Sequence, residues 1–289
     1  FIGLGPPGSV NPREKHNVVV VPGYHSYIRG LVAGGGAGKG AGAGLPTSQL
    51  LNNVAFGHVM YSEDAGDTYR IPGGLESATR SGVGCNEAQI VQLLNGSLLL
   101  NTRTLSLGSP QFRAQSRSDD HGLTWTPSRF LDDIPEPFNG CEGSVASSKS
   151  GDVIYMTHPN SVENHGVVRG LSLTCITESQ TQQQQQQHSN TQVPETVKHL
   201  LNGKVNLTGR DHMTLYESSN QGETYEVKRV LDSGASGYSS IQVDGSSLWV
   251  FYEQSDELAQ SIEELGIEAL IGSLSVLNPD RLVLKKVDI

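Results

Sequence analysis

The chain carries the octapeptide SDDHGLTW at residues 118–125, and its pattern, Ser-x-(Asp/Asn)-x-Gly-x-Thr-aromatic, recurs as SEDAGDTY at 62–69 and SSNQGETY at 218–225. In each copy the Asp or Asn side chain can accept hydrogen bonds from nearby backbone N–H groups while the Gly takes positive φ, which predicts a hairpin turn. Each copy follows a strand-like run, at 54–61, 112–116 and 213–216. Three such units indicate an all-β repeat architecture in which turn residues such as Asp120 are structural rather than catalytic.

Composition narrows the classes of function. The 289 residues have a formal net charge of −10, and 36% of them are hydrophobic, which is enough to bury a core in one large β domain or two small ones. An acidic chain argues against nucleic-acid binding, and a negatively charged substrate would have to be held by local arginines. No apolar run reaches the ~18 residues of a membrane span. The cysteines Cys85, Cys141 and Cys175 are odd in number and lack zinc-ligand spacing, so neither a disulfide framework nor a metal cluster is expected.

Two stretches of low complexity interrupt the chain. Residues 29–45 are rich in Gly and Ala, and residues 177–205 include the six consecutive glutamines 182–187. Neither stretch has enough apolar side chains to pack, so we expect both to be flexible insertions. We expect the remainder of residues 1–289 to form a single domain.

Four side chains stand in patterns that can form a site. A strand, an Asn-Gly turn and a second strand are predicted over residues 85–103, which would bring Glu87 and Arg103 to the same end of a hairpin. Tyr238 is surrounded by Gly and Ser residues that let a ligand approach closely, and Arg169 stands at the start of a further strand-like run. These patterns alone leave open whether the charges are solvated surface groups and the tyrosine a turn residue.

An ordered set of short motifs resembles the sialidases, in which the octapeptide turns are known as Asp boxes. The order and spacing are most similar to the lysosomal-type animal enzyme, from about residue 5 to the C-terminus apart from the two insertions. Besides the octapeptides, the motifs are Asn86-Glu87-Ala88-Gln89, Leu100-Asn101-Thr102-Arg103, Val168-Arg169-Gly170-Leu171, Gly237-Tyr238-Ser239-Ser240 and Phe251-Tyr252-Glu253. Each motif alone is weak, whereas the ordered set is specific.

The resemblance implies a six-bladed β-propeller with four strands per blade and a site at its central axis. It implies exo-cleavage of terminal α-linked sialic acids from glycoproteins, gangliosides and oligosaccharides, with retention of configuration. The anomeric carbon of sialic acid bears a carboxylate, so a neutral phenol can attack it where an anionic nucleophile would be repelled. The resemblance requires no cofactor, and it implies a lysosomal or secreted protein.

The resemblance also implies roles for individual residues. Tyr238 is expected to be the nucleophile, and Glu87 the general base that removes its proton. Arg103 and Arg169 are expected to hold the substrate carboxylate through bidentate hydrogen bonds, and Glu253 to orient the family's remaining arginine. An enzyme requires these side chains to converge, and so does a propeller that binds sialosides without cleaving them; a purely structural propeller does not.

Two residues of the family lack a counterpart. Its first arginine lies in a Phe/Tyr-Arg-Ile-Pro segment before the first Asp box, whereas Tyr69-Arg70-Ile71-Pro72 follows that box, so we expect Arg70 to lie on the rim. Residues 1–60 contain no aspartate that could serve as the acid/base. With blades of ~40–50 residues the chain has room for about five, so we expect the first blade to be missing. Residues 1–289 are accordingly expected to hydrolyse sialosides weakly or not at all.

Overall fold

The structure is a computed structural model, and it describes residues 2–4, 9–28, 53–73, 85–104, 112–137, 140–160, 210–255 and 281–289. Within these residues, fourteen β-strands form four antiparallel sheets. The predicted insertions at 29–45 and 177–205 lie outside the described residues. No helix in the described part of the chain is long and apolar enough to cross a membrane.

Each sheet is built from strands that follow one another in the chain. The first sheet contains β1 (Ile2–Leu4), β2 (Val19–Ile28) and β3 (Asn53–Ser62). The second contains β4 (Cys85–Gln92), β5 (Leu98–Thr104), β6 (Phe112–Ser118) and β7 (Arg129–Pro135). The third contains β8 (Ser144–Ser147), β9 (Ile154–Pro159), β10 (Met213–Ser218) and β11 (Glu226–Val230). The fourth contains β12 (Ala235–Asp244), β13 (Ser247–Ser255) and β14 (Arg281–Asp288).

The three octapeptides form turns with a shared set of hydrogen bonds. In the second copy, Asp120 accepts from the backbone N–H of Thr124 at 2.9 Å and from the Thr124 hydroxyl at 2.5 Å. Gly122 has a φ of +101°, a conformation that glycine adopts without strain. The same backbone bond recurs in the other two copies, where Asp64 and Asn220 are the acceptors. The turn geometry predicted from the pattern is therefore present at all three positions.

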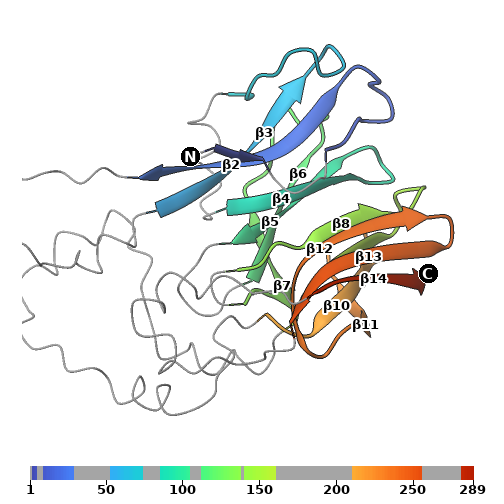
Figure 1. Ribbon diagram of the computed structural model, residues 1–289. Helices are drawn as coiled ribbons and strands as arrows, with labels where there is room; N and C mark the ends of the chain where they lie inside the picture. Colours follow the sequence, from blue (N-terminus) through green and yellow to red (C-terminus); the bar gives the residue numbers. More distant parts are fainter. Residues whose placement is uncertain are drawn as a thin grey trace, which may run out of the picture.

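Apolar side chains pack between consecutive sheets, which lie side by side in chain order (Figure 1). The cluster between the first and second sheets contains Val18, Val20, Val59, Tyr61, Ile90 and Leu98. The second and third sheets share Val91, Leu93, Leu99, Leu131, Ile134, Val145, Ile154, Met156, Tyr216 and Tyr225. The third and fourth share Tyr155, Met213, Leu215, Leu231, Ile241, Leu248, Val250, Tyr252 and Val287. The first strands of three neighbouring sheets lie together, because β8 contacts both β4 and β12, and these strands line the inner side of the arrangement.

The prediction of an all-β protein is confirmed, as is the hairpin over residues 85–103. Its two strands, β4 and β5, pair in antiparallel register, and Gly96 in the turn has a φ of +90°. The described residues account for four sheets, and the number of six blades stays a prediction.

Candidate active site

Two β-bulges present the predicted base and the predicted nucleophile. On β4, the pair Asn86-Glu87 opposes the single residue Arg103 of β5. On β12, the pair Gly237-Tyr238 opposes the single residue Glu253 of β13. An extra residue in a strand disturbs the regular alternation of side chains and re-aims one of them. Because β4 and β12 are inner strands of two different sheets, both bulges can direct a side chain to the same place.

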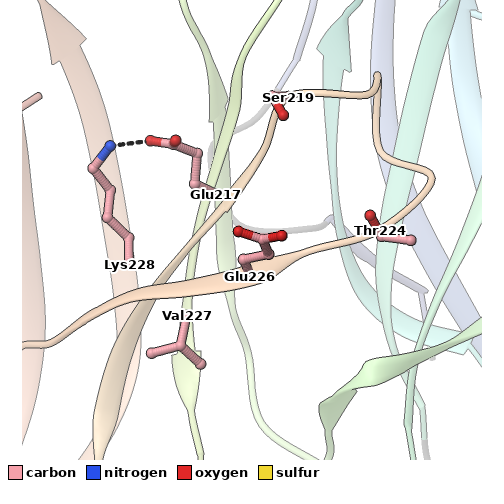
Figure 2. Close-up of a pocket in the computed structure, with 6 residues that line it drawn as sticks. All are labelled: Glu217, Ser219, Thr224, Glu226, Val227 and Lys228. Atoms are coloured by element: carbon pink, nitrogen blue, oxygen red, sulfur yellow. Dashed lines mark hydrogen bonds and ion pairs between the residues drawn. The ribbon is translucent and has the colours of Figure 1, made fainter.

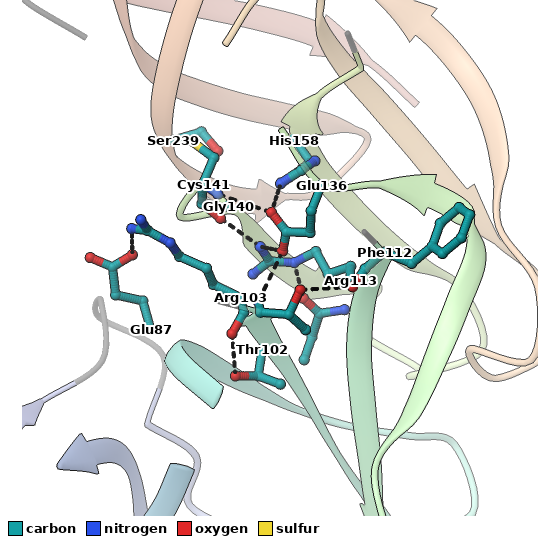
Figure 3. Close-up of polar contacts among 12 residues, drawn as sticks. Glu87, Thr102, Arg103, Phe112, Arg113, Glu136, Gly140, Cys141, His158 and Ser239 are labelled. Carbon is teal, nitrogen blue, oxygen red and sulfur yellow. Dashed lines mark hydrogen bonds and ion pairs between the residues drawn. The ribbon is translucent and has the colours of Figure 1, made fainter. Parts of the chain in front are cut away.

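Glu87, Arg103 and Tyr238 form a hydrogen-bonded triangle. The Tyr238 hydroxyl donates to Oε1 of Glu87 at 3.2 Å, across 151 positions of sequence. Nη1 of Arg103 donates to Oε2 of Glu87 at 2.7 Å and to the hydroxyl oxygen of Tyr238 at 3.0 Å. Figure 3 shows the Arg103 side chain reaching toward Glu87. Arg103 is buried, whereas the Glu87 side chain is 17% exposed and Tyr238 is half-buried, so the base and the phenol can be reached from solvent.

Burial keeps the phenol at the triangle protonated. Burial raises the pKa of Tyr238; the Arg103 guanidinium opposes this shift and the Glu87 carboxylate adds to it. Burial alone would lower the pKa of Arg103, but the adjacent Glu87 carboxylate raises it, so Arg103 stays charged. A neutral phenol thus lies beside a carboxylate that can take its proton and a fixed cation that can stabilise the phenolate.

Arg210 is a second arginine at this site, and it lies in none of the sequence motifs quoted above. Its guanidinium carbon lies 5.1 Å from the centre of the Tyr238 ring, and its Nη2 donates to the Gly140 carbonyl at 3.0 Å. The residue is 2% exposed. An arginine at the entry of a strand was the signal that pointed to Arg169, and the same signal precedes β10 at Arg210. Arg169 itself lies outside the described residues.

Glu253 stands opposite the Tyr238 bulge on β13. Burial raises its pKa; the Arg210 guanidinium opposes the shift and the Glu87 carboxylate adds to it. Its carboxyl group is therefore within electrostatic reach of Arg210, the arginine that lies over the Tyr238 ring.

Arg70 lies apart from the triangle. It follows the first octapeptide turn, where it forms an exposed ion pair with Glu63 at 3.2 Å and stacks over the Tyr61 ring at 5.2 Å. Its side chain is 53% exposed. This surface position is the one expected for a residue at the exit of a turn.

Tyr24 and Glu142 also lie near the triangle, although neither belongs to a motif predicted to form the site. Burial and the Glu87 carboxylate raise the pKa of Tyr24 on β2, whereas Arg103 opposes the shift. Glu142, just before β8, is buried and accepts the backbone N–H of Ser239 at 3.0 Å. Burial, assisted by Glu87, raises the pKa of Glu142 to about 8. Glu142 stands next to a glycine, as Tyr238 does, and that shared pattern could have drawn attention to it.

A surface pocket lies elsewhere, along the outer strand β11 and the third octapeptide turn (Figure 2). It is lined by Glu217, Ser219, Thr224, Glu226, Val227 and Lys228. An ion pair joins Lys228 to Glu217 there, and none of the residues of the triangle contributes to it. Among the residues that the structure describes, no group of three or more His, Cys, Asp or Glu side chains is arranged to hold a metal ion.

Comparisons with known proteins show the family and the fold of this chain. The family model of the BNR repeat-like domain matches residues 19–250. Human Sialidase-4 is 32% identical over 126 residues, which is 37% of this chain and 25% of that protein. The match therefore spans about a quarter of the length of this curated relative.

Solved structures with a similar fold include a leech intramolecular trans-sialidase, with a TM-score of 0.54 and 18% identity over 100% of this chain and 32% of that chain. An intramolecular trans-sialidase from Ruminococcus gnavus gives a TM-score of 0.52 and 18% identity, over 100% of this chain and 44% of that chain. At such identities the likeness shows the fold alone. Together with the family model, these findings confirm the resemblance inferred from the motifs: the chain belongs to the family of BNR repeat-like domains, and its relatives are sialidases.

Proposed function

We propose that this chain carries the nucleophile and the base of an exo-α-sialidase, which hydrolyses terminal α-linked sialic acids with retention of configuration. Because residues 1–60 supply no acid/base aspartate, we expect hydrolysis by residues 1–289 alone to be weak or absent. The observation that carries the proposal is the triangle, in which the Tyr238 phenol lies 3.2 Å from a Glu87 oxygen and 3.0 Å from a nitrogen of Arg103. A phenol becomes a useful nucleophile only when a base stands beside it, and Glu87 occupies that place. Sialylated glycoproteins, gangliosides and oligosaccharides form the proposed substrate class.

In the first step Glu87 takes the hydroxyl proton of Tyr238 while the phenol oxygen bonds to the anomeric carbon. The bond from that carbon to the leaving oxygen breaks, and the leaving oxygen takes a proton from an acid or from water. In the second step water attacks the same carbon, its proton passes to solvent, and the released phenolate recovers its proton from Glu87. Two inversions at one carbon leave the configuration unchanged.

The substrate carboxylate requires cations in a chain whose net charge is −10. Arg103 is held in its charged form at the triangle, and Arg210 lies over the Tyr238 ring. We assign these two arginines to the carboxylate, with Arg169 as a third and Glu253 orienting Arg210. A fixed guanidinium pair favours a planar carboxylate through bidentate hydrogen bonds.

The test is covalent trapping with a sialosyl fluoride that carries a second fluorine beside the anomeric carbon. Fluoride leaves without a proton, so the assay does not depend on an acid residue, and the second fluorine slows hydrolysis of the intermediate. We expect the intact mass to rise by one fluorosialosyl group, with the label on Tyr238. Tyr238→Phe should bind a sialoside and remain unlabelled, whereas Tyr69→Phe, at an exposed tyrosine in the first turn, should label normally.

Two other outcomes contradict the proposal in different ways. A wild-type chain that binds sialosides and is never labelled is a binding propeller rather than an enzyme. A label on another residue removes Tyr238 from the role of nucleophile. If labelling occurs, Glu87→Gln should slow it by roughly 10²–10⁴-fold, because the proton of the phenol then lacks its acceptor.

A further inference from the structure

Four buried residues between β7 and β8, namely Glu136, Gly140, Cys141 and Glu142, bond to residues adjacent to the triangle, to Arg210 or to one another. We call them the clamp residues. All four are buried, and none belongs to the triangle. Their contacts reach the backbone beside Tyr238, the backbone beside Arg103 and the side chain of Arg210.

Glu142 fixes the strand that carries the phenol. The backbone N–H of Ser239, the residue after Tyr238, donates to Oε2 of Glu142 at 3.0 Å. β12 is an edge strand of its sheet, so N–H groups on its free side have no neighbouring strand to bond. A buried N–H without a partner is costly, and Glu142 supplies that partner directly behind the bulge.

Glu136 fixes the strand end that carries Arg103. The backbone N–H of Thr104, the residue after Arg103, donates to Oε1 of Glu136 at 3.3 Å. The backbone N–H of Cys141 donates to Oε2 at 2.9 Å. One carboxylate therefore joins the end of β5 to the segment that leads into Glu142.

Glu136 is itself held by a buried network (Figure 3). Arg113 forms an ion pair with Oε1 at 3.1 Å, and Nε2 of His158 lies 3.1 Å from Oε2. Burial works to raise the pKa of Glu136, yet His158 and Arg113 together hold it below its ordinary value. Burial lowers the pKa of His158, which favours the neutral imidazole. We therefore assign the positive charge that stabilises the Glu136 carboxylate to Arg113. The carboxylate is thus ionised and fully engaged.

Gly140 fills the space between the two arginines of the site. Its carbonyl accepts from Nη2 of Arg210 at 3.0 Å. A Cβ at this position would lie 2.4 Å from the Thr104 carbonyl oxygen and 2.9 Å from Cγ of Arg103. The φ of +69° also favours glycine. A larger residue would therefore collide with the Thr104 carbonyl and displace the Arg103 side chain.

We infer that the clamp residues are positioning residues, which hold Tyr238, Arg103 and Arg210 in the geometry of sialosyl transfer without touching the substrate. This inference rests on the proposed function. A misplacement of about 1 Å at a reacting group can slow a reaction by on the order of 10²-fold. The phenol and its supporting cations come from separate sheets and strands, so a shared anchor is the simplest way to fix their mutual distances.

The test measures the rate of covalent labelling of Tyr238 by the difluorinated sialosyl fluoride, as a function of its concentration. Glu142→Ala removes the acceptor of the Ser239 N–H, so the maximal labelling rate should fall by roughly 10–100-fold while half-saturation changes less than about threefold. Glu142→Gln keeps a neutral acceptor of the same size and should label within about threefold of wild type. Glu136→Gln offers one oxygen where two were engaged, so its labelling should also slow.

Glu226→Ala, at an exposed glutamate of β11, is the matched control and should label at the wild-type rate. Labelling of Glu142→Ala at the wild-type maximal rate would overturn the inference, as would Glu142→Gln being as slow as Glu142→Ala. Should Glu142→Ala fail to fold, Glu136→Gln and Gly140→Ala replace it in the test. Labelling of these variants at the wild-type maximal rate would then overturn the inference. Absence of labelling in wild type itself contradicts the proposed function instead, so the two failures are distinct.

Discussion

The turn carboxylate Asp64 and the clamp carboxylate Glu142 are the same chemical group in opposite surroundings. Hydrogen bonds from Thr68 and Ser62 lower the pKa of the exposed Asp64 to about 2. Burial raises the pKa of Glu142 to about 8. The hydrogen bonds of Asp64 come from residues within four positions, whereas Glu142 accepts from Ser239, 97 positions away.

This difference separates two ways of using an acidic side chain. The turn carboxylate needs only its own octapeptide, and the surrounding water helps to keep it ionised. The clamp carboxylates need at least two sheets to be assembled, because their partners come from distant strands. Changes in a turn should therefore have small, local effects, and changes at the clamp should alter both stability and chemistry.

The largest effect is expected from Arg113→Leu. This change leaves Glu136 buried without its cation, which should lower the free energy of unfolding by about 3–5 kcal/mol. Arg70→Leu removes an exposed ion pair beside the first turn and should cost no more than about 1 kcal/mol. Urea denaturation of both variants measures the two free energies of unfolding. Equal losses would contradict the distinction between the buried and the exposed ion pair.

A second contrast uses two glycines that share positive φ. Gly140 has a φ of +69° and no room for a Cβ, whereas Gly96 has a φ of +90° and nothing within 4 Å. Gly96→Ala should cost about 1–2 kcal/mol, the strain of a left-handed non-glycine residue. Gly140→Ala adds a collision with the Thr104 carbonyl, so we expect about 3 kcal/mol or more in urea denaturation. Similar losses of stability in both variants would mean that the clamp residues accommodate a Cβ at position 140 without extra loss of stability.

The pH dependence of stability should differ in sign between the two carboxylates. The pKa of Asp64 is depressed in the fold, so its contribution is present above pH 3.8 and is lost as pH falls toward about 2. The pKa of Glu142 is raised, so its contribution is present below pH 4.5 and is lost as pH rises to about 8. Glu87, Glu253 and Arg113 act on Glu142 from other strands.

Glu142→Gln should therefore gain stability relative to wild type as pH rises from 4.5 to 8, by on the order of 1–3 kcal/mol. Asp64→Asn should be less stable than wild type near neutral pH, and this difference in stability should disappear as pH falls below 3.8. Urea denaturation across this pH range gives both differences. A flat profile for Glu142→Gln relative to wild type would show that Glu142 is ionised in the fold.

Local features were predictable because their partners are close in the chain. The three turns need only a hydroxyl, a carboxyl or amide, and a glycine within one octapeptide, and the sequence displays all of these. The Asn-Gly turn likewise set the register that brings Glu87 opposite Arg103. The proximity of Tyr238 to Glu87, across 151 positions, was predicted only through the resemblance to a family.

Long-range features were not predictable in the same way. Each bulge depends on a two-against-one register that no periodicity in the sequence reveals. Arg210 follows a strand-entry pattern shared with Arg169, and the sequence offers no rule for choosing between them. Tyr24 approaches Glu87 only because the first sheet packs on the second. The contacts of such residues form only when the sheets pack together, so the structure is needed to identify them.

The smallest effect is expected from Asp64→Asn, and it tests whether the turns are truly interchangeable. The third turn already has Asn220 in this place, where its Oδ1 accepts the backbone N–H of Thr224 at 3.0 Å and its Nδ2 donates to the Thr224 hydroxyl at 2.8 Å. Asparagine therefore preserves the backbone bond and only reverses the direction of the bond to the threonine. The melting temperature at neutral pH should fall by no more than about 2–4 °C. Asp64→Ala removes both bonds from Thr68 and the bond from the Ser62 hydroxyl, so its melting temperature should fall further. If Asp64→Asn matched it, the charge rather than the hydrogen-bond pattern would hold the turn.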